Sequence, residues 1–176
     1  QLRHLPRKKI KDNIGINSKN TDIADFESQT DTNIVTSKNT KIKDGTVKGK
    51  FTNTSDNTTV TNKLTVTGDA DINSTNDVII NEISSNNLNI DSKNANVTKL
   101  TSVKDTVINT VNDTTIKDGT VGGKFTNKSG TTVVDEVTGE TTVVAGDTKV
   151  TGTLTVTGDA DIDSTQVHPE IKVLYK

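Results

Sequence analysis

The amino-acid sequence predicts an all-β, elongated, fibrous structure of short strands, formed by an intertwined or stacked homotrimer of the triple β-helix or β-prism type. Three observations lead to this prediction: a recurring stretch with alternating polarity, a larger internal repeat, and a low content of large apolar side chains. The first two favour strands over helices, and the third favours a core that several chains share.

The recurring stretch covers residues 64–75 and returns at residues 154–165 with one difference among twelve positions. Its apolar residues share one parity: Leu64, Val66, Ala70 and Ile72. Side chains alternate across a β-strand, so this parity predicts two short strands, each buried on one face. Gly68 lies between them, where the chain can bend. We therefore expect Leu64 and Val66, with their equivalents Leu154 and Val156, in the core.

The larger repeat makes residues 14–53 and 88–127 two copies of one unit, in which position 14 corresponds to position 88. A helical stripe of apolar residues in the segment 97–111 is polar at three of its five positions in the first copy. The unit is therefore read as short strands between Asn-, Asp-, Ser- and Gly-rich turns. A short helix over 97–111 is the remaining alternative.

The repeats suggest how the chain is divided. A first β unit covers residues 14–75, a connecting strand 76–87, and a second β unit 88–165. The second unit contains an insert, 130–145, in which two β-branched runs flank a Thr-Gly turn signal, and we expect a hairpin there. Residues 166–176 are a tail or the start of a further domain.

The composition motivates the trimer. Leu, Ile, Val and Phe make up 44 of 176 residues, while Thr and Asn contribute 33 and 19. One chain with so few large side chains would have difficulty offsetting its conformational entropy, whereas three chains could pool them. Disorder is the rival interpretation. The net charge of only −2 and the regular spacing of β-branched residues argue against it.

Residues 1–13 form a basic arm, for which we expect no regular structure. The proposed anchoring residues all lie in this arm: Arg3, Arg7, Lys8, Lys9 and Lys11. A basic run of this kind can contact nucleic acid or an acidic partner. The arm has no interleaved aromatic residues, so nucleic acid is not the expected partner, and a solvated terminus that docks on a neighbouring subunit or domain is preferred.

Two patterns resemble binding loops without completing them. Asp159, Asp161 and Asp163 resemble the opening of a calcium loop with Glu170 at the twelfth position, but Ser164 stands where that loop needs glycine. The first copy repeats only the opening, at Asp69, Asp71 and Asn73. We expect outward-facing polar residues of a strand at both places, and no metal site.

The second pattern is Gly45 and Gly49 followed by Lys50, which resembles a phosphate-binding loop. That loop needs four residues between the glycines, where this chain has three, and Ser or Thr after the lysine. Phe51 follows instead, so we expect glycines at chain crossings and both Phe51 and its equivalent Phe125 in the core.

Catalysis is not expected. The chain has no cysteine, and its two histidines, His4 and His168, lie near opposite ends of the sequence. We expect no catalytic residues and no cofactor. There is also no stretch of about 20 apolar residues of the kind that spans a membrane.

Residues 153–162, preceded by 150–152, resemble the shaft repeats of trimeric bacteriophage tail fibres and related virion appendage fibres. The likeness is one of composition and period, and covers about 25 residues over the two copies. It implies a structural fibre segment of a phage-like virion that supports host attachment. The implied partners are two further copies, other virion structural proteins, and a host glycan or receptor bound through a region outside this chain.

Two other functions would also suit an elongated β structure with few large apolar residues. One is the stalk of an adhesin on a bacterial cell surface. The other is a single-chain β-solenoid that polymerises end to end as a scaffold. The number of chains in the folded unit distinguishes the fibre trimer from the solenoid.

Overall fold

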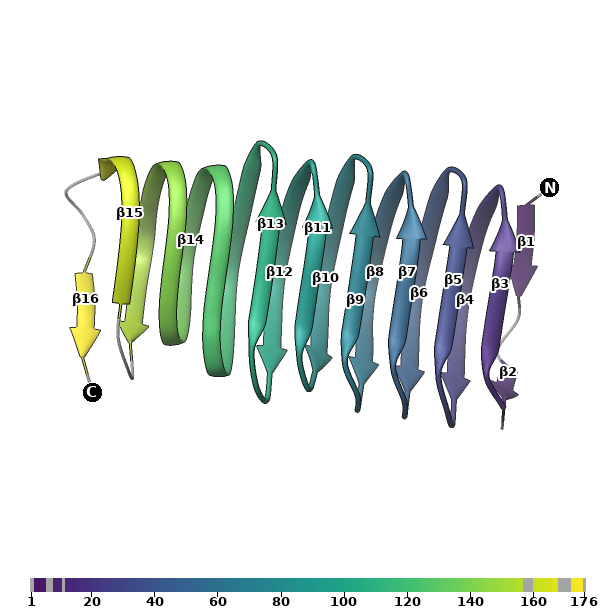
Figure 1. Cartoon of the computed structure of the whole chain (residues 1–176). Coiled ribbons are helices and arrows are strands. Elements are labelled where there is room, and N and C mark those ends of the chain that lie inside the picture. Colours follow the sequence, from purple (N-terminus) through teal and green to yellow (C-terminus); the bar gives the residue numbers. More distant parts are fainter. Residues whose placement is uncertain (1, 6–7, 11, 157–159, 168–171, 176) are drawn as a thin grey trace.

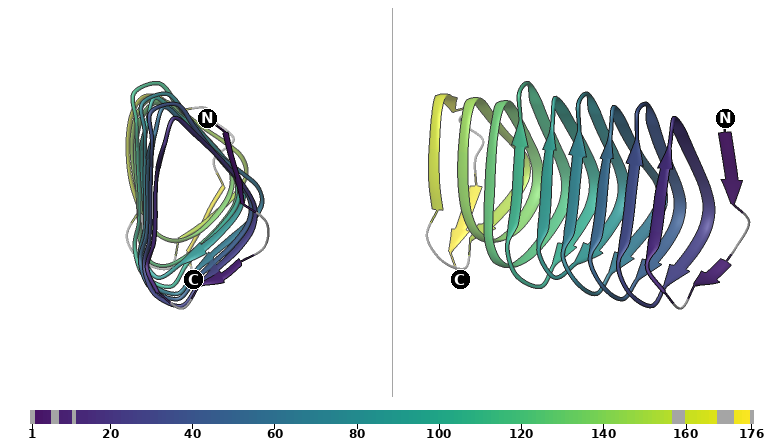
Figure 2. Two further views of the ribbon diagram at one scale, coloured as in Figure 1. Left: turned by 90° about the vertical axis from the view of Figure 1, so that its right-hand side faces the viewer. Right: turned by 45° about the vertical axis from the view of Figure 1, so that its right-hand side comes forward.

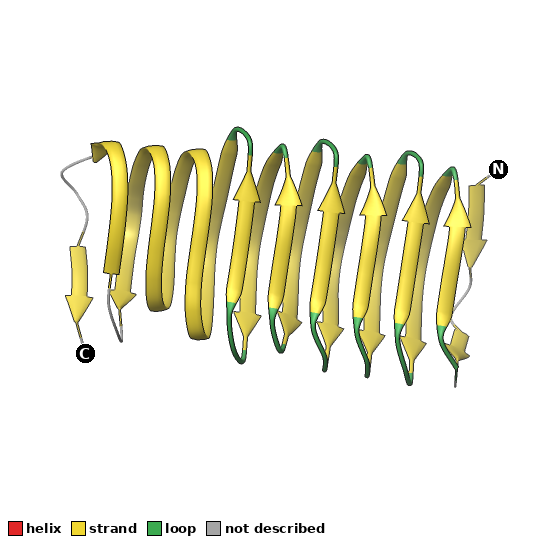
Figure 3. Cartoon of the chain, in the orientation of Figure 1, coloured by secondary structure: helices red, strands yellow, loops and turns green. Residues whose placement is uncertain are grey.

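A computed structural model shows the chain as a parallel β-solenoid, in which one chain winds into successive coils that stack along a common axis (Figure 1). The structure describes residues 2–5, 8–10, 12–156, 160–167 and 172–175, and side-chain positions over 12–133. The described residues form strands and short connections without a helix, so the all-β prediction is confirmed (Figure 3).

Each coil contains one short and one long strand. The short strands are β3 (Ile14–Ser18), β5 (Thr32–Thr36), β7 (Phe51–Ser55), β9 (Ala70–Ser74), β11 (Leu88–Ser92) and β13 (Thr106–Thr110). The long strands are β4 (Asn20–Ser28), β6 (Asn39–Val47), β8 (Asn57–Val66), β10 (Asp77–Ser85) and β12 (Asn94–Ser102). The N-terminal strands are β1 (Leu2–Leu5) and β2 (Lys8–Ile10), and the C-terminal ones β14 (Asp113–Val156), β15 (Ala160–Val167) and β16 (Lys172–Tyr175).

Every strand pair assigned in the structure is parallel, and each strand pairs with its counterpart one coil away. The coils differ slightly in length, and the difference is absorbed partly in the turns that lead into the long strands and partly at the bends of some long strands. One example is the register shift between Ile42 and Asp44 of β6 against β8. The short strands pair without such a shift from β3 through β13.

A bend divides each long strand into two faces. In β4 the alternation of buried and open residues is broken where Ala24 and Asp25 are both partly exposed, and β6 repeats the break at Lys43 and Asp44. Together with the flat short strand, the two halves give the coil a three-sided outline in end-on view (Figure 2).

The core is filled in columns along the axis. Phe51, Phe125, Leu64 and Val66 are buried, as are Ile34, Ile72, Ile90 and Ile108 in the middle column of the short strands, while Ile16 in the first short strand is partly buried. At the corner between short and long strands, most of the described coils instead place inward Ser and Thr residues whose hydroxyls bond to one another, while Val78 and Ala95 take the place of one partner in two others. The side chains of Leu154 and Val156 lie outside the described residues.

One chain therefore encloses its own core. The shared core was predicted because one chain has few large apolar residues. Hydrogen-bonded Ser and Thr pairs occupy interior volume that a conventional core would give to large aliphatic side chains, and such pairs satisfy their own polar atoms. The low apolar content consequently does not require partner chains.

Two local expectations are corrected. Residues 1–13 are not an arm without regular structure, because Leu2–Leu5 pairs with Asn20–Ile23 and Lys8–Ile10 with Phe26–Ser28. These strands meet backbone groups on the edge of β4 that would otherwise be unpaired. Arg3, Lys8 and Lys9 therefore lie in the first coil, while Arg7 and Lys11 are outside the described residues.

The second correction concerns the insert at 130–145. A hairpin would pair its two runs antiparallel, but residues 113–156 wind on as β14, and Thr141–Thr148 runs parallel to Ala160–Val167 of the next coil. The insert is close to one coil in length, and its two β-branched runs suit two faces of a coil as well as two arms of a hairpin. The segment 97–111 contains the second part of β12, a turn and β13, so the alternative of a short helix is wrong.

Candidate functional site

The two Gly-Lys-Phe sequences mark the corner where the chain enters a short strand. Asp31 Oδ1 accepts the backbone N–H of Lys50 at 2.7 Å, and Asp105 Oδ1 accepts that of Lys124 at 2.9 Å. A Cβ on Gly49 would collide with the Asp31 carboxylate, so glycine makes room for this contact. The phenylalanine that follows is buried. The motif is a structural corner, and its lysine N–H is already engaged.

This corner carries a ladder of polar residues, which we call the entry ladder: Asn13, Asp31, Lys50, Asp69, Asn87, Asp105 and Lys124. Asn13 Oδ1 accepts the N–H of Asp31 at 3.3 Å, and Asn87 Oδ1 accepts that of Asp105 at 3.1 Å. At most steps of the ladder, a backbone N–H at the corner thus donates a hydrogen bond to an Asn or Asp side-chain oxygen of the preceding coil. A similar ladder of Asn and Asp begins the long strands, where Asn57 Nδ2 donates to Asn39 Oδ1 at 2.9 Å.

Charged groups also pair along the axis. Lys38 reaches Asp56 at 3.2 Å, Lys63 reaches Glu82 at 2.7 Å, and Lys50 pairs with Asp71. The hydrogen bond from Lys63 lowers the pKa of Glu82, and the bond to Asp71 raises the pKa of Lys50. The amide of Asn87 lowers the pKa of Asp69, with further donors from the Asn87 backbone and from Asn86. The ion pairs lie at the surface between neighbouring coils, and each contributes little by itself.

Two buried asparagines interrupt the isoleucine column. Asn53 lies between Ile34 and Ile72, and its Nδ2 donates to Ser55 Oγ at 3.1 Å and Thr58 Oγ1 at 2.7 Å. Its Oδ1 has no partner among the described atoms. Asn127 repeats the arrangement with Ser129 and Thr132, again with an unpartnered Oδ1.

The residues that resembled a calcium loop are separated in the first copy. Asp69 belongs to the entry ladder, Asp71 pairs with Lys50, and Asn73 lies on the flat outer face of β9. Within the described part of the chain, no three His, Cys, Asp or Glu residues are grouped as metal ligands. The side chains of Asp161 and Asp163, and all of Asp159 and Glu170, are outside the described residues.

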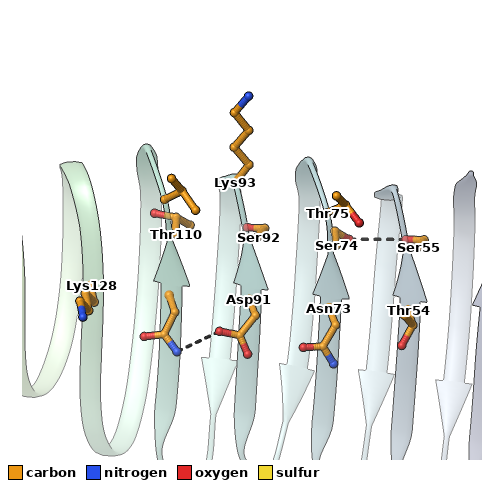
Figure 4. A pocket seen from close by; sticks show the side chains of 12 residues that line it. Thr54, Ser55, Asn73, Ser74, Thr75, Asp91, Ser92, Lys93, Thr110 and Lys128 are labelled. Carbon is orange, nitrogen blue, oxygen red and sulfur yellow. Dashed lines mark hydrogen bonds between the residues drawn. The ribbon is translucent and has the colours of Figure 1, made fainter.

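A shallow groove of about 760 Å³ runs along the flat face formed by the short strands (Figure 4). We call it the flat-face groove. One outward column contributes one residue from each of five successive coils, and the turns that follow the short strands form its rim. The column residues are Thr54, Asn73, Asp91, Asn109 and Lys128, and the rim residues are Thr75, Lys93 and Val111. The sequence predicted the outward parity of such residues but gave no sign that a groove would form over them.

Comparisons with protein-family models, with curated proteins and with solved structures found no match. Within the described residues the structure contains no helix that could cross a membrane.

Proposed function

We propose that this chain is a shaft segment of an extracellular fibre, in the first instance an appendage of a phage-like virion. The observation that carries the proposal is the repetition of one closed coil. Over residues 12–133 each coil stacks on the previous one with the same core columns, the same corners and a mostly polar outer surface. Such a stack sets a length and separates whatever lies at its ends.

The bonding along the axis suits this role. Neighbouring coils are tied by parallel backbone ladders on all three faces, for example between β6 and β8 and between β5 and β7. The entry ladder and the axial ion pairs add side-chain contacts between the same coils. An axial load is therefore distributed over many bonds in each coil, and no catalytic step is needed.

The proposal keeps a homotrimer but changes how its three chains are arranged. Since each core is closed within one chain, three chains would pack as separate solenoids side by side instead of intertwining. Other virion structural proteins remain the proposed neighbours, and a host receptor would be contacted through a region outside this chain.

The stalk of a bacterial surface adhesin is a second candidate, and the closed core supports it. A solenoid that buries its own apolar side chains can extend from a cell surface as one chain. This role needs the same length, polar exterior and axial bonding.

An antibody against residues 12–133 tests the proposal. We expect immunogold electron microscopy to label fibres on purified particles from the producing organism. Label on fibres of the cell surface, with none on particles, would assign the adhesin role. An antigen found only inside cells would contradict both.

A further inference from the structure

We propose that the flat-face groove binds an extended, negatively charged oligosaccharide that lies along the solenoid axis. This binding site would lie on the side of the shaft, and it does not depend on which appendage the shaft belongs to. The argument rests on the free polar groups of the groove, its charge and its repeat distance.

Some polar side chains of the groove form no hydrogen bond to another described residue. Thr54 and Asn73 project from β7 and β9 onto the flat face, and neither side chain has a hydrogen-bond partner among the described residues (Figure 4). Further along, Asn109 Nδ2 donates to Asp91 Oδ1 at 3.0 Å, which leaves Asp91 Oδ2 and Asn109 Oδ1 as acceptors. Hydroxyl and amide groups of this kind bond well to the hydroxyls of a sugar.

The charge of the groove is opposite to that of the whole chain. Lys93 on the rim and Lys128 in the column form no ion pair with another described residue. Asp91 is the one carboxylate that the described residues contribute to the lining, and the amide of Asn109 is bonded to it. Among the described residues, two ammonium groups without an ion-pair partner face one carboxylate, and this balance favours an anionic ligand, although the chain carries a net charge of −2.

The repeat of the column favours a linear polymer. Strands in a sheet are about 4.8 Å apart, so five coils present one polar side chain each over about 19 Å. One hexose unit of an extended glycan is similar in length to one such step. Successive sugars could therefore meet successive coils in the same way.

Other ligand classes fit less well. A protein interface usually has buried aromatic or aliphatic anchors, whereas Val111 is the only apolar residue among the described lining residues. Nucleic acid binds through several Lys and Arg residues, and the carboxylate of Asp91 would oppose its phosphates. A glycan with carboxylates on some of its sugars uses both the neutral groups and the two lysines.

The test uses three probes of defined length: hexasaccharides of galacturonate and of hyaluronan, both acidic, and cellohexaose, which is neutral. Isothermal titration should show that at least one acidic hexasaccharide binds tighter than cellohexaose by about tenfold or more, a difference of about 1.4 kcal/mol. The same hexasaccharide should exceed the affinity of a disaccharide of the same acidic glycan by a similar factor. Binding should weaken as salt is added.

Matched variants locate the site. Lys93→Glu with Lys128→Glu should lower the affinity by about tenfold or more, because both favourable charges become repulsive. Lys41→Glu with Lys99→Glu makes the same charge change on the long strands, away from the groove, and should change it by no more than about twofold. Asn73→Ala should weaken binding without changing its salt dependence. Binding by neither acidic probe, equal binding of cellohexaose, or equal losses in the two double variants would overturn the proposal.

Discussion

Asp31 and Gly49 lie at the same corner of successive coils, and the carboxylate of the first occupies the space that a side chain on the second would need. Asp31 Oδ1 accepts the N–H of Lys50 at 2.7 Å, and the atoms closest to a Cβ on Gly49 are those of Thr30 and Asp31. Asp105 and Gly123 repeat the relationship. Because Gly49 has no side chain, the Asp31 carboxylate of the preceding coil can come close enough to accept the Lys50 N–H.

Gly49→Ala should destabilise the fold by about 1–3 kcal/mol, because the methyl group displaces the Asp31 carboxylate or shifts the backbone. Gly15→Ala is the control, since a Cβ there meets nothing within 4 Å. Urea denaturation of both variants provides the comparison. Equal stability of the two would show that the corner tolerates a side chain.

Phe51→Ala and Phe125→Ala should each cost about 3–5 kcal/mol, because both rings are fully buried at equivalent positions of the two copies. Val103 is 70% exposed, and Val103→Ala should change the free energy of unfolding by no more than about 0.5 kcal/mol. Urea denaturation again provides the comparison. A small effect at either phenylalanine would contradict its place in the core columns.

Asn53→Ile should leave the fold as stable as before or stabilise it by about 1–3 kcal/mol. The change removes an unpartnered buried carbonyl and restores the isoleucine column, while Ser55 and Thr58 remain bonded to each other at 2.9 Å. The midpoint of chemical denaturation measures this. A clear loss of stability would mean that the two bonds donated by the amide outweigh the unsatisfied oxygen.

Asp69 should make the fold sensitive to acid. Its pKa is lowered in the folded chain, chiefly by the amide of Asn87, so its contribution to stability is present above the unfolded value of about 3.9. That contribution is lost as the pH falls through the folded pKa. Asp69→Asn should therefore lose less stability than the parent chain between about pH 5 and pH 2.5, as followed by urea denaturation at each pH. Parallel curves for the two proteins would contradict this.

The coil was present in the sequence, but its period was hard to recognise. Ile16 and Ile34 are neighbours in one column, yet Ile23 and Phe26 fall between them in the sequence, on the two halves of the long strand. The bend breaks the parity there, so the spacing of the apolar residues predicts short strands at steps of about eight residues and does not reveal a coil of 18 or 19 residues. Parity itself was reliable, because the apolar residues of the stretch 64–72 are all buried, as their alternation predicted.

Other features could not be read from the sequence. Whether a chain poor in large apolar residues closes its own core depends on hydroxyl pairs such as Thr36 with Thr40, which become partners only once the corner is formed. The flat-face groove likewise collects single residues from five coils, each of them ordinary in its own strand. The entry ladder had a detectable signal, since its members precede the short strands at nearly constant intervals.

The offset between the two copies spans four coils, because Ile14, Thr32, Phe51, Ala70 and Leu88 follow one another in one column. Deleting residues 14–87 would therefore join position 13 to position 88 and recreate the natural Asn-Leu junction. Deleting residues 14–78 does not remove a whole number of coils, and serves as the control.

Small-angle X-ray scattering of the two deletion variants tests the single-chain solenoid most directly. We predict that the four-coil deletion folds and that its largest dimension is shorter by about 19 Å, at about 4.8 Å per coil, with the same cross-section. The mismatched deletion should lose this rod-like profile. A four-coil deletion that fails to fold, or that keeps the parent length, would contradict the stack of independent, closed coils.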